Sequence, residues 1–242
     1  MRRLYPDPTN LVEPADAYAF PADTPRYLRV NMVSSIDGAA AVNGRAGPLS
    51  GTADHELLHL NRKLADVLLI GAGTVRAEGY GPIRLSEEWQ RRRVAAGQEP
   101  VPRLAVVSRS LNLNFSAPVF ATASARPLVL TTKDAPQDRR EVADTVADVV
   151  EAGLNEVSMT TAVDRLVERG LIRILSEGGP HLLAELFAAG QVDELCLTVA
   201  PVVTCGPEMR ITAGRPLPVP ADLALAGAFE EDHFLFLRYM RR

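Results

Sequence analysis

Residues 174–186 read ILSEGGPHLLAEL, and this stretch decides the class of fold. It begins as an uninterrupted apolar run typical of a buried strand and ends as an apolar helix. Gly178 and Gly179 suit a tight turn between them, and Pro180 suits the first turn of a helix, where its missing N–H leaves no helical bond unmade. The stretch therefore predicts a strand, a turn and a helix in succession, which is the unit of α/β folds.

The same alternation recurs along the chain. Apolar runs predict strands at about 27–34, 66–71, 103–108, 127–132, 146–150, 171–175 and 193–199. Amphipathic runs predict helices at about 52–65, 73–79, 86–97, 137–143, 160–169 and 180–189. Uniformly apolar runs such as VLLIG favour parallel strands covered on both faces, whereas the alternating GAFEEDHFLFLRYM favours an antiparallel edge. We therefore predict a mixed, mostly parallel central sheet with helices on both faces.

Length and composition are those of an ordinary globular protein. The 242 residues are 47% hydrophobic and 23% charged, and no apolar run approaches the roughly 20 residues that cross a bilayer. No secretory leader is recognisable, so we expect a cytoplasmic protein without a membrane partner. Residues 1–26 carry five prolines and little periodicity, which predicts an extended arm lying over the surface. Residues 27–242 show no repeat or composition break and are expected to form a single domain.

Charge and cysteine content narrow the expected partners. The net charge of −4 argues against nucleic acid, and we interpret the basic run Arg91–Arg93, which has no interleaved aromatic residues, as a solvated helix face. Cys196 and Cys205 are too few for a disulfide framework and lack further ligands at zinc spacing. Small molecules are therefore the expected partners.

Two strand-to-helix junctions are candidates for an anion site, because open α/β sheets bind ligands at the carboxyl ends of their strands. One is the SEGGP turn, and the other is LLIGAGTVRAEG at 68–79, in which Gly71 and Gly73 precede a helix opened by Thr74. Free N–H groups and the positive end of a helix dipole at each junction suit the two phosphates of a diphosphate. Alternatively, the glycines only let the chain turn. The Rossmann spacing G-x-G-x-x-G is absent from both.

The acidic and polar residues near these junctions are not explained by an anion site. Glu177 would repel a phosphate, so we interpret it as an acceptor for ligand hydroxyl or amino groups or, alternatively, as the structural partner of an arginine. Asn31, Ser34, Ser35 and Asp37 cluster at the end of a predicted strand, where they form either a plain hairpin or part of a ligand site. In the second case Asp37 would act as proton donor if burial raised its pKa.

The sequence HELLH at His55–His59 matches the H-E-x-x-H pattern of zinc proteases. Arg62 follows on the same helix face and would place a positive charge beside the metal ion. Glu78, the possible third ligand, is separated from the helix by a whole buried strand. We therefore expect no metal and interpret this segment as a polar helix face that borders a cleft.

Four motifs in order resemble one known family. They are SSIDG at 34–38, LNRKLADVLLIGAGTVRAE at 60–78, LAVVSR at 104–109 and ILSEGGPHLLAELFAAGQVDELCLTVAPVVTCG at 174–206. Together they are similar to the C-terminal reductase domain of the bifunctional deaminase-reductases of riboflavin biosynthesis, which has a dihydrofolate-reductase-like fold. The zinc-deaminase motif is absent, so the chain resembles this reductase domain as a stand-alone protein.

The resemblance implies NADPH, a homodimer, and hydride transfer from nicotinamide to a ribosylamino-pyrimidine phosphate. It assigns the substrate-binding positions to Asn31, Arg62 and Glu177. It assigns the cofactor-binding positions to Val33, Thr74, Glu78, Ser108, Arg109, Gly178, Gly179, Pro180, His181, Leu182 and Leu183. In these terms the HELLH helix is the one that delivers Arg62 to the substrate phosphate.

Two departures keep other functions open. Asn31 stands where the family has a lysine in the first strand, and Pro48 stands where it usually has a tryptophan. Both positions belong to the substrate and nicotinamide end and not to the cofactor phosphates. The alternatives are a dihydrofolate or pterin reductase on the same fold, and a non-catalytic NADPH-binding protein.

Overall fold

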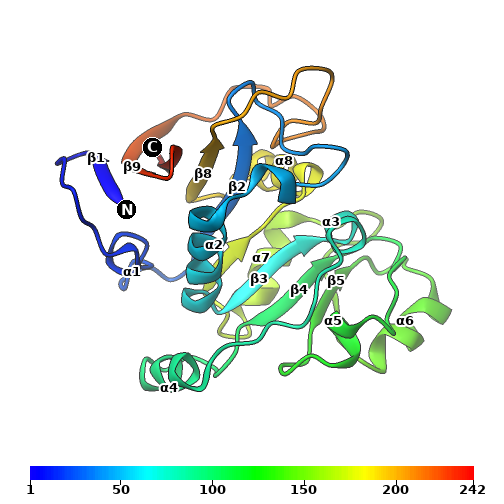
Figure 1. The fold of residues 1–242 in the computed structure, drawn as a ribbon. Coiled ribbons are helices and arrows are strands. Elements are labelled where there is room, and N and C mark those ends of the chain that lie inside the picture. Colours follow the sequence, from blue (N-terminus) through cyan, green and yellow to red (C-terminus); the bar gives the residue numbers. More distant parts are fainter.

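One ten-stranded sheet organises the chain, and the computed structural model describes all residues 1–242 (Figure 1). The strand order is β1-β9-β10-β8-β2-β7-β3-β4-β5-β6. The strands are β1 (Arg2–Tyr5), β2 (Tyr27–Ser35), β3 (Val67–Gly71), β4 (Arg103–Val107), β5 (Leu128–Thr131), β6 (Asp148–Glu151), β7 (Arg173–Ser176), β8 (Glu194–Ala200), β9 (Leu223–Glu231) and β10 (Phe234–Arg241). All neighbours from β8 to β6 are parallel, and those from β1 to β8 are antiparallel. The mixed, mostly parallel sheet is thus confirmed.

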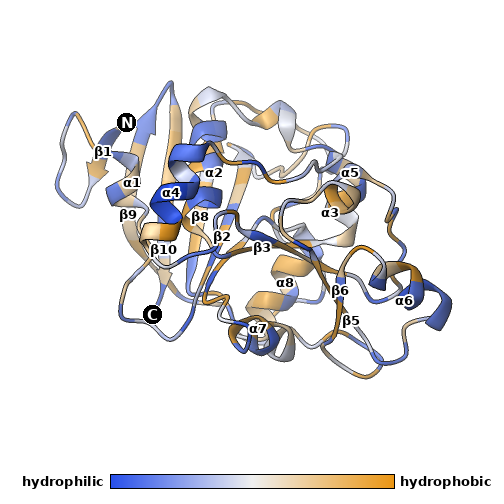
Figure 2. Ribbon diagram, turned by 90° about the horizontal axis from the view of Figure 1, so that it is seen from below, coloured by the Kyte–Doolittle hydropathy of each residue, from blue (hydrophilic) through white to orange (hydrophobic).

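Helices cover both faces of this sheet. They are α1 (Pro14–Ala17), α2 (Thr52–Leu64), α3 (Ala72–Glu78), α4 (Glu87–Ala95), α5 (Pro118–Ala121), α6 (Gln137–Asp144), α7 (Met159–Val167) and α8 (Pro180–Ala188), with a 3₁₀ turn at Gly47–Leu49. The apolar sides of α7 and α8 pack into one core cluster with the strands, and those of α5 and α6 pack into another. Figure 2 shows the contrast between the hydrophobic α8 and the hydrophilic α4. None of these helices is long and apolar enough to span a bilayer.

The order of the parallel strands brings the predicted ligand-binding junctions together. Strands β2, β7, β3 and β4 are consecutive neighbours, so their carboxyl ends lie side by side. The turns that follow β3 and β7 both contain the predicted glycines, and they touch: the Gly71 N–H donates to the Gly178 carbonyl at 2.9 Å. Segments a hundred residues apart in sequence thus form one wall.

The N-terminal arm is more firmly attached than its prolines suggest. Strand β1 pairs with β9 and becomes the edge of the sheet. Tyr18 is completely buried and packs against Phe229, so the expectation of an arm that only lies over the surface is wrong for this residue. We propose that residues 27–242 form one domain, to which residues 1–26 are fastened.

A buried charge cluster fastens the arm. Glu194 is completely buried and accepts hydrogen bonds from Arg29 Nε at 2.7 Å and from Arg238 Nε at 2.6 Å. Arg29 in turn donates to the Tyr18 carbonyl at 2.6 Å, and Arg238 donates to the Ala17 carbonyl. One carboxylate therefore orients two arginines, and these satisfy backbone carbonyls that would otherwise be buried without a partner.

The basic run Arg91–Arg93 is not wholly a solvated face, and this interpretation is corrected for one residue. Arg93 is only 2% exposed. Its guanidinium donates to the carbonyls of Lys63, Ala65 and Glu99 at 2.6–2.9 Å, which ties α4 to the end of α2. A run of charges does not reveal from sequence that one member will find buried backbone acceptors.

Candidate active site

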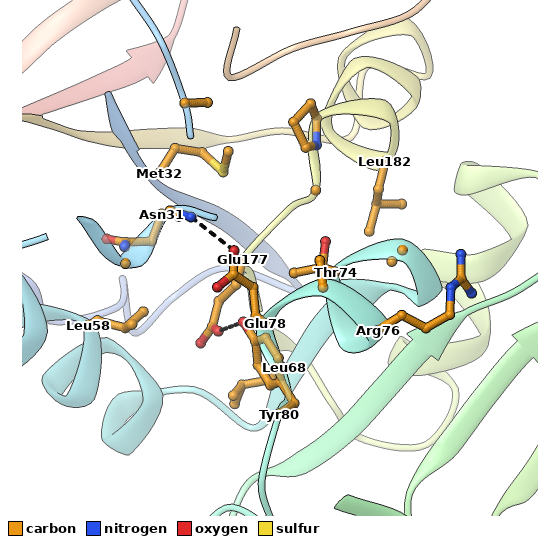
Figure 3. Close-up of a pocket in the computed structure, with 18 of the residues that line it drawn as sticks. Asn31, Met32, Leu58, Leu68, Thr74, Arg76, Glu78, Tyr80, Glu177 and Leu182 are labelled. Carbon is orange, nitrogen blue, oxygen red and sulfur yellow. Dashed lines mark hydrogen bonds between the residues drawn. The ribbon is translucent and has the colours of Figure 1, made fainter. Parts of the chain in front are cut away.

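A cavity of about 1400 Å³ lies at the carboxyl edge of the sheet (Figure 3). Residues from β2, α2, the β3–α3 and β7–α8 turns and the end of β4 line it. Pockets for one drug-sized ligand measure about 300–1000 Å³, so this cavity has room for two ligands side by side. Two parts of its lining differ in chemistry: a glycine end formed by the two turns, and an ion-pair end formed by Arg62 and Glu177, the residue that precedes Gly178 in the chain.

The glycine end is packed too tightly for any side chain. A Cβ at Gly179 would lie 2.7 Å from Thr74 Oγ1, and a Cβ at Gly178 would lie 3.0 Å from Met32 Sδ. Gly178 also has φ of +80°, a backbone conformation that L side chains rarely adopt. The prediction that glycine is needed at this junction is therefore explained by close approach of the two turns.

The N-terminus of α8 opens onto this end of the cavity. Gly179, Pro180, His181 and Leu182 line it, and no side chain caps the helix. Pro180 has no N–H, so the donors left for an anion are the backbone groups of its neighbours. Leu183 does not fit its expected role, because its side chain is fully buried in the core and its N–H already donates to the Gly179 carbonyl. Gly178 also lies outside the lining, behind Gly179.

Replacement of Gly179 by alanine tests the close approach. We expect the added methyl group to displace Thr74 or the turn at a cost of about 1–3 kcal/mol, and to weaken cofactor binding about tenfold to a hundredfold. The measurement is a fluorescence titration with NADPH. In the double variant Gly179→Ala/Thr74→Ala the clashing oxygen is gone, so binding should return to the level of Thr74→Ala alone. Equal affinity of wild type and Gly179→Ala would contradict the prediction.

The other residues assigned to the cofactor also reach the cavity. Val33 lies at the end of β2, and Ser108 and Arg109 follow β4. Arg109 is exposed and lies in the same lining as Arg76, a residue that the motifs did not single out. Glu78 accepts a hydrogen bond from the Ala46 N–H at 3.0 Å, and thereby holds the loop after β2 over the cavity.

The ion-pair end of the cavity is built around Glu177. Arg62 donates to both carboxylate oxygens, with Nε at 2.6 Å from Oε1 and Nη2 at 2.7 Å from Oε2. The Tyr80 hydroxyl donates to Oε2, and the Arg62 guanidinium lies 5.5 Å from the centre of the Tyr80 ring. The structure thus brings two of the three predicted substrate residues, Arg62 and Glu177, together as a bidentate ion pair, the structural alternative considered for Glu177.

Burial and the charge of Glu177 shift the pKa values of Arg62 and Tyr80. Burial alone would lower the pKa of Arg62, but the hydrogen bonds and charge of Glu177 outweigh it and raise the pKa further. Burial, followed by the charge of Glu177, raises the pKa of Tyr80 well above its ordinary value of 10.0. Arg62 is therefore a permanent cation here, and Tyr80 a neutral hydrogen-bond donor.

Asn31, the third predicted substrate residue, also lines the cavity. It is almost fully buried, and the Asn61 side-chain amide donates to its Oδ1 at 3.5 Å. Asn61 is held in turn by Arg29, which donates to its Oδ1 at 3.0 Å. Asn31 therefore faces the cavity from a position fixed by α2 and the buried charge cluster (Figure 3).

Asp37 does not meet the condition for a proton donor, and this prediction is corrected. Its side chain is exposed and does not line the cavity. Hydrogen bonds from Ser35 Oγ and from the N–H groups of Cys205 and Thr204 lower its pKa to about 2, the opposite of the rise that proton donation needs. Asp37 instead anchors the loop after β8, through contacts 167 residues away that no local pattern reveals.

The HELLH segment forms one wall of the cavity. His55 and His59 lie on the polar face of α2, as expected, and both line the cavity with Arg62. Burial and the charge of Arg62 lower the pKa of His59. No group of three or more histidine, cysteine or acidic side chains is placed to hold a metal ion.

Sequence reasoning missed several polar residues of the lining, among them Tyr80 and Asp54. Tyr80 lies in the irregular segment after α3, and Asp54 lies in the first turn of α2. A tyrosine between glycines and an acidic residue near a helix start are both common without function, so neither carried a signal. Their importance follows only from the partners that the fold gives them.

Comparison with known proteins now gives the family. Residues 26–229 match the model of the RibD C-terminal domain. The chain belongs to the RibD C-terminal domain family. The resemblance seen in the four sequence motifs is thereby confirmed, and the match covers most of the domain that begins near β2.

Two relatives illustrate the RibD C-terminal domain family. The 2,5-diamino-6-ribosylamino-4(3H)-pyrimidinone 5′-phosphate reductase of Archaeoglobus fulgidus is 28% identical over 181 residues, which are 74% of this chain and 82% of that protein. The crystal structure of a pyrimidine reductase-like protein from Corynebacterium diphtheriae has a TM-score of 0.81 and 29% identity, and covers 90% of this chain and 92% of that one. These relatives agree with the predicted reductase and with the dihydrofolate-reductase-like fold.

A third comparison shows the fold alone. The Thermotoga maritima diaminohydroxyphosphoribosylaminopyrimidine deaminase/5-amino-6-(5-phosphoribosylamino)uracil reductase has a TM-score of 0.69 at 18% identity, and the match covers 90% of this chain and 57% of that one. The names of the Archaeoglobus and Thermotoga proteins describe different rings: a 2-aminopyrimidinone in the first and a uracil in the second.

Proposed function

We propose that this protein is an NADPH-dependent reductase of 2,5-diamino-6-ribosylamino-4(3H)-pyrimidinone 5′-phosphate. The observation that carries the proposal is a single large cavity whose lining holds both a glycine cradle with a helix N-terminus and the Arg62–Glu177 pair. Such a cavity accommodates a dinucleotide and a phosphorylated substrate together. The named reductases among the relatives support the same activity.

The glycine end fits a nicotinamide dinucleotide phosphate. Its diphosphate would meet the N–H groups of Gly179, His181 and Leu182 at the start of α8, where a Cβ at Gly179 would collide with Thr74. Arg76 and Arg109 lie in the same lining near Ser108, so two cations are available for a 2′-phosphate. When bound, the nicotinamide supplies the hydride, and the protein positions and shields the reacting carbon.

The ion-pair end fits the substrate. Arg62 uses one edge for Glu177, which leaves Nη1 to meet a phosphate oxygen. Glu177 and the Tyr80 hydroxyl provide polar contacts for the ribose-derived chain, and Asn31 lines the same cavity. Because Asp37 lies outside the cavity, we assign the proton to a water molecule in place of that residue.

The remaining expectations extend this proposal. We infer a homodimer and a cytoplasmic location from the family resemblance. The alternating C-terminal run offers no free strand edge for pairing two chains, because β1 pairs with β9 and forms the edge of the sheet.

One assay set tests the proposed function. We expect NADPH oxidation with the diaminopyrimidinone phosphate to exceed the rates with dihydrofolate and with no second substrate, and NADPH to be preferred to NADH. Turnover of dihydrofolate alone would replace the proposal with the pterin reductase. Tight NADPH binding with no turnover of either compound would identify a non-catalytic binding protein.

A further inference from the structure

Asp54 is a buried acid in the cavity wall with no role so far. It is 4% exposed, lies in the first turn of α2 and lines the cavity. Ser50 Oγ donates to its Oδ2, but its Oδ1 is buried without any hydrogen-bond partner. An unpaired buried acceptor costs about 1–3 kcal/mol, so a native structure that keeps one calls for an explanation.

The place of Asp54 in the first turn of α2 and its hydrogen bond from Ser50 account for Oδ2 but leave Oδ1 without a partner. Asn61, which is completely buried on the same helix, uses its amide group fully: it accepts from Arg29 and donates to the Leu57 carbonyl and to Asn31. Four buried side-chain polar atoms in the protein lack a partner, and only Asp54 Oδ1 belongs to a residue that lines the cavity. A donor from a ligand would complete it.

The position of Asp54 indicates which part of a ligand it meets. Asp54, Leu58 and Arg62 are spaced four residues apart, so they follow one face of α2, and all three line the cavity. Eight residues of helix place Asp54 about 12 Å along the axis from Arg62. A substrate whose phosphate meets Arg62 and whose chain follows this face of α2 would place its pyrimidine ring near Asp54.

We propose that Asp54 binds the ring edge formed by N3–H and the 2-amino group, and that it thereby selects 2-aminopyrimidinones against uracils. This inference rests on the proposed function and names its substrate class more narrowly. A carboxylate only accepts hydrogen bonds, and this edge offers two adjacent donors. A uracil has a carbonyl oxygen in place of the 2-amino group, which would face the carboxylate acceptor to acceptor. Binding of this edge requires the carboxylate group of Asp54 to rotate, because Oδ1 is buried and Oδ2 is held by Ser50.

The experiment compares kcat/KM for the 2,5-diamino-pyrimidinone phosphate and for its uracil counterpart, 5-amino-6-(5-phosphoribosylamino)uracil. We expect wild type to prefer the 2-amino substrate by about a hundredfold or more, because a buried polar site rejects a ligand that leaves it unpaired. In Asp54→Asn the preference should fall at least tenfold, since the amide N–H₂ can donate to the uracil carbonyl. Asp164→Asn makes the same change on the exposed face of α7 and should leave the preference unchanged.

A binding titration separates this inference from the proposed function. Calorimetry with each pyrimidine phosphate and no cofactor should show weaker binding of the 2-amino compound to Asp54→Asn, with the uracil less affected. Should Asp54→Asn be unfolded by circular dichroism, Asp54→Glu keeps the acceptor and should keep the sign of the preference. Equal use of both substrates by wild type, or an equal loss for both in Asp54→Asn, overturns the role of Asp54. No turnover of either substrate by wild type overturns the proposed function, and the titration then still decides the preference.

Discussion

Arg62→Met should lower kcat/KM for the pyrimidine phosphate by about a hundredfold to a thousandfold. The substitution keeps the length of the side chain but removes the guanidinium that holds Glu177 at 2.6 and 2.7 Å and that we assign to the substrate phosphate. Loss of one partner from a hydrogen-bonded charge pair costs about 2–5 kcal/mol, and each 1.4 kcal/mol is a factor of ten. Steady-state kinetics with NADPH and the diaminopyrimidinone phosphate measure the loss.

Two further variants identify the cause of the activity loss expected in Arg62→Met. Arg62→Lys keeps the charge but not the fork, so we expect partial activity with a raised KM. Arg62→Met/Glu177→Gln removes the uncompensated carboxylate and should recover thermal stability lost in Arg62→Met, but not activity, if Arg62 binds substrate. Recovery of activity in the double variant would show that Arg62 only neutralises Glu177. Activity of Arg62→Met within threefold of wild type would contradict both roles.

Most of the strands and helices were predictable because they depend on a local pattern. The β7–α8 unit was expected at 171–175 and 180–189, and lies at Arg173–Ser176 and Pro180–Ala188. Strand β1 gives no such signal, since its four residues become a strand only by pairing with β9. Local patterns therefore reveal elements with their own periodicity and miss those that exist through a distant partner.

The site follows the same rule. The glycines at the SEGGP turn were predicted from a local need for a turn, and the structure adds that Thr74 leaves no room for a Cβ at Gly179. The partners of Glu177 lie 97 and 115 residues away, and Asp37 is bound by Thr204 and Cys205, 167 and 168 residues away, as well as by nearby Ser35. Sequence could therefore propose roles for these acids but not their surroundings. The surroundings made one acid the partner of an arginine and the other a loop anchor.

Distant partners also explain why the N-terminal arm is held so firmly, and Glu194→Gln tests this directly. The change leaves Arg29 and Arg238 as buried cations without their shared carboxylate. Removing one partner of a buried ion pair costs about 3–5 kcal/mol, which for a chain of this size lowers Tm by roughly 6–20 °C. Thermal and denaturant unfolding at neutral pH measure the effect, and limited proteolysis should cut the freed arm first.

Asp148→Asn is a matched control for Glu194→Gln, because the two carboxylates differ mainly in how deeply they are buried. Asp148 also accepts from two arginines, Arg103 at 2.6 Å and Arg126 at 2.7 Å, but its side chain is 44% exposed, so we expect a loss of at most about 1 kcal/mol. Equal losses in the two variants would show that burial of Glu194 does not matter.

The pH dependence of stability independently tests whether the Glu194 carboxylate holds the two arginines and the N-terminal arm. Burial would raise the pKa of Glu194, but Arg29 and Arg238 outweigh it and hold the pKa below its ordinary value of 4.5. A folded-state pKa below the unfolded value means that the carboxylate stabilises the fold fully above pH 4.5, and that this contribution is lost as the pH falls through the folded-state pKa. The difference in stability between wild type and Glu194→Gln should therefore be constant near neutral pH and narrow only in acid. A difference that grows on acidification would mean that the two arginines, and with them the arm, are held by something other than this carboxylate.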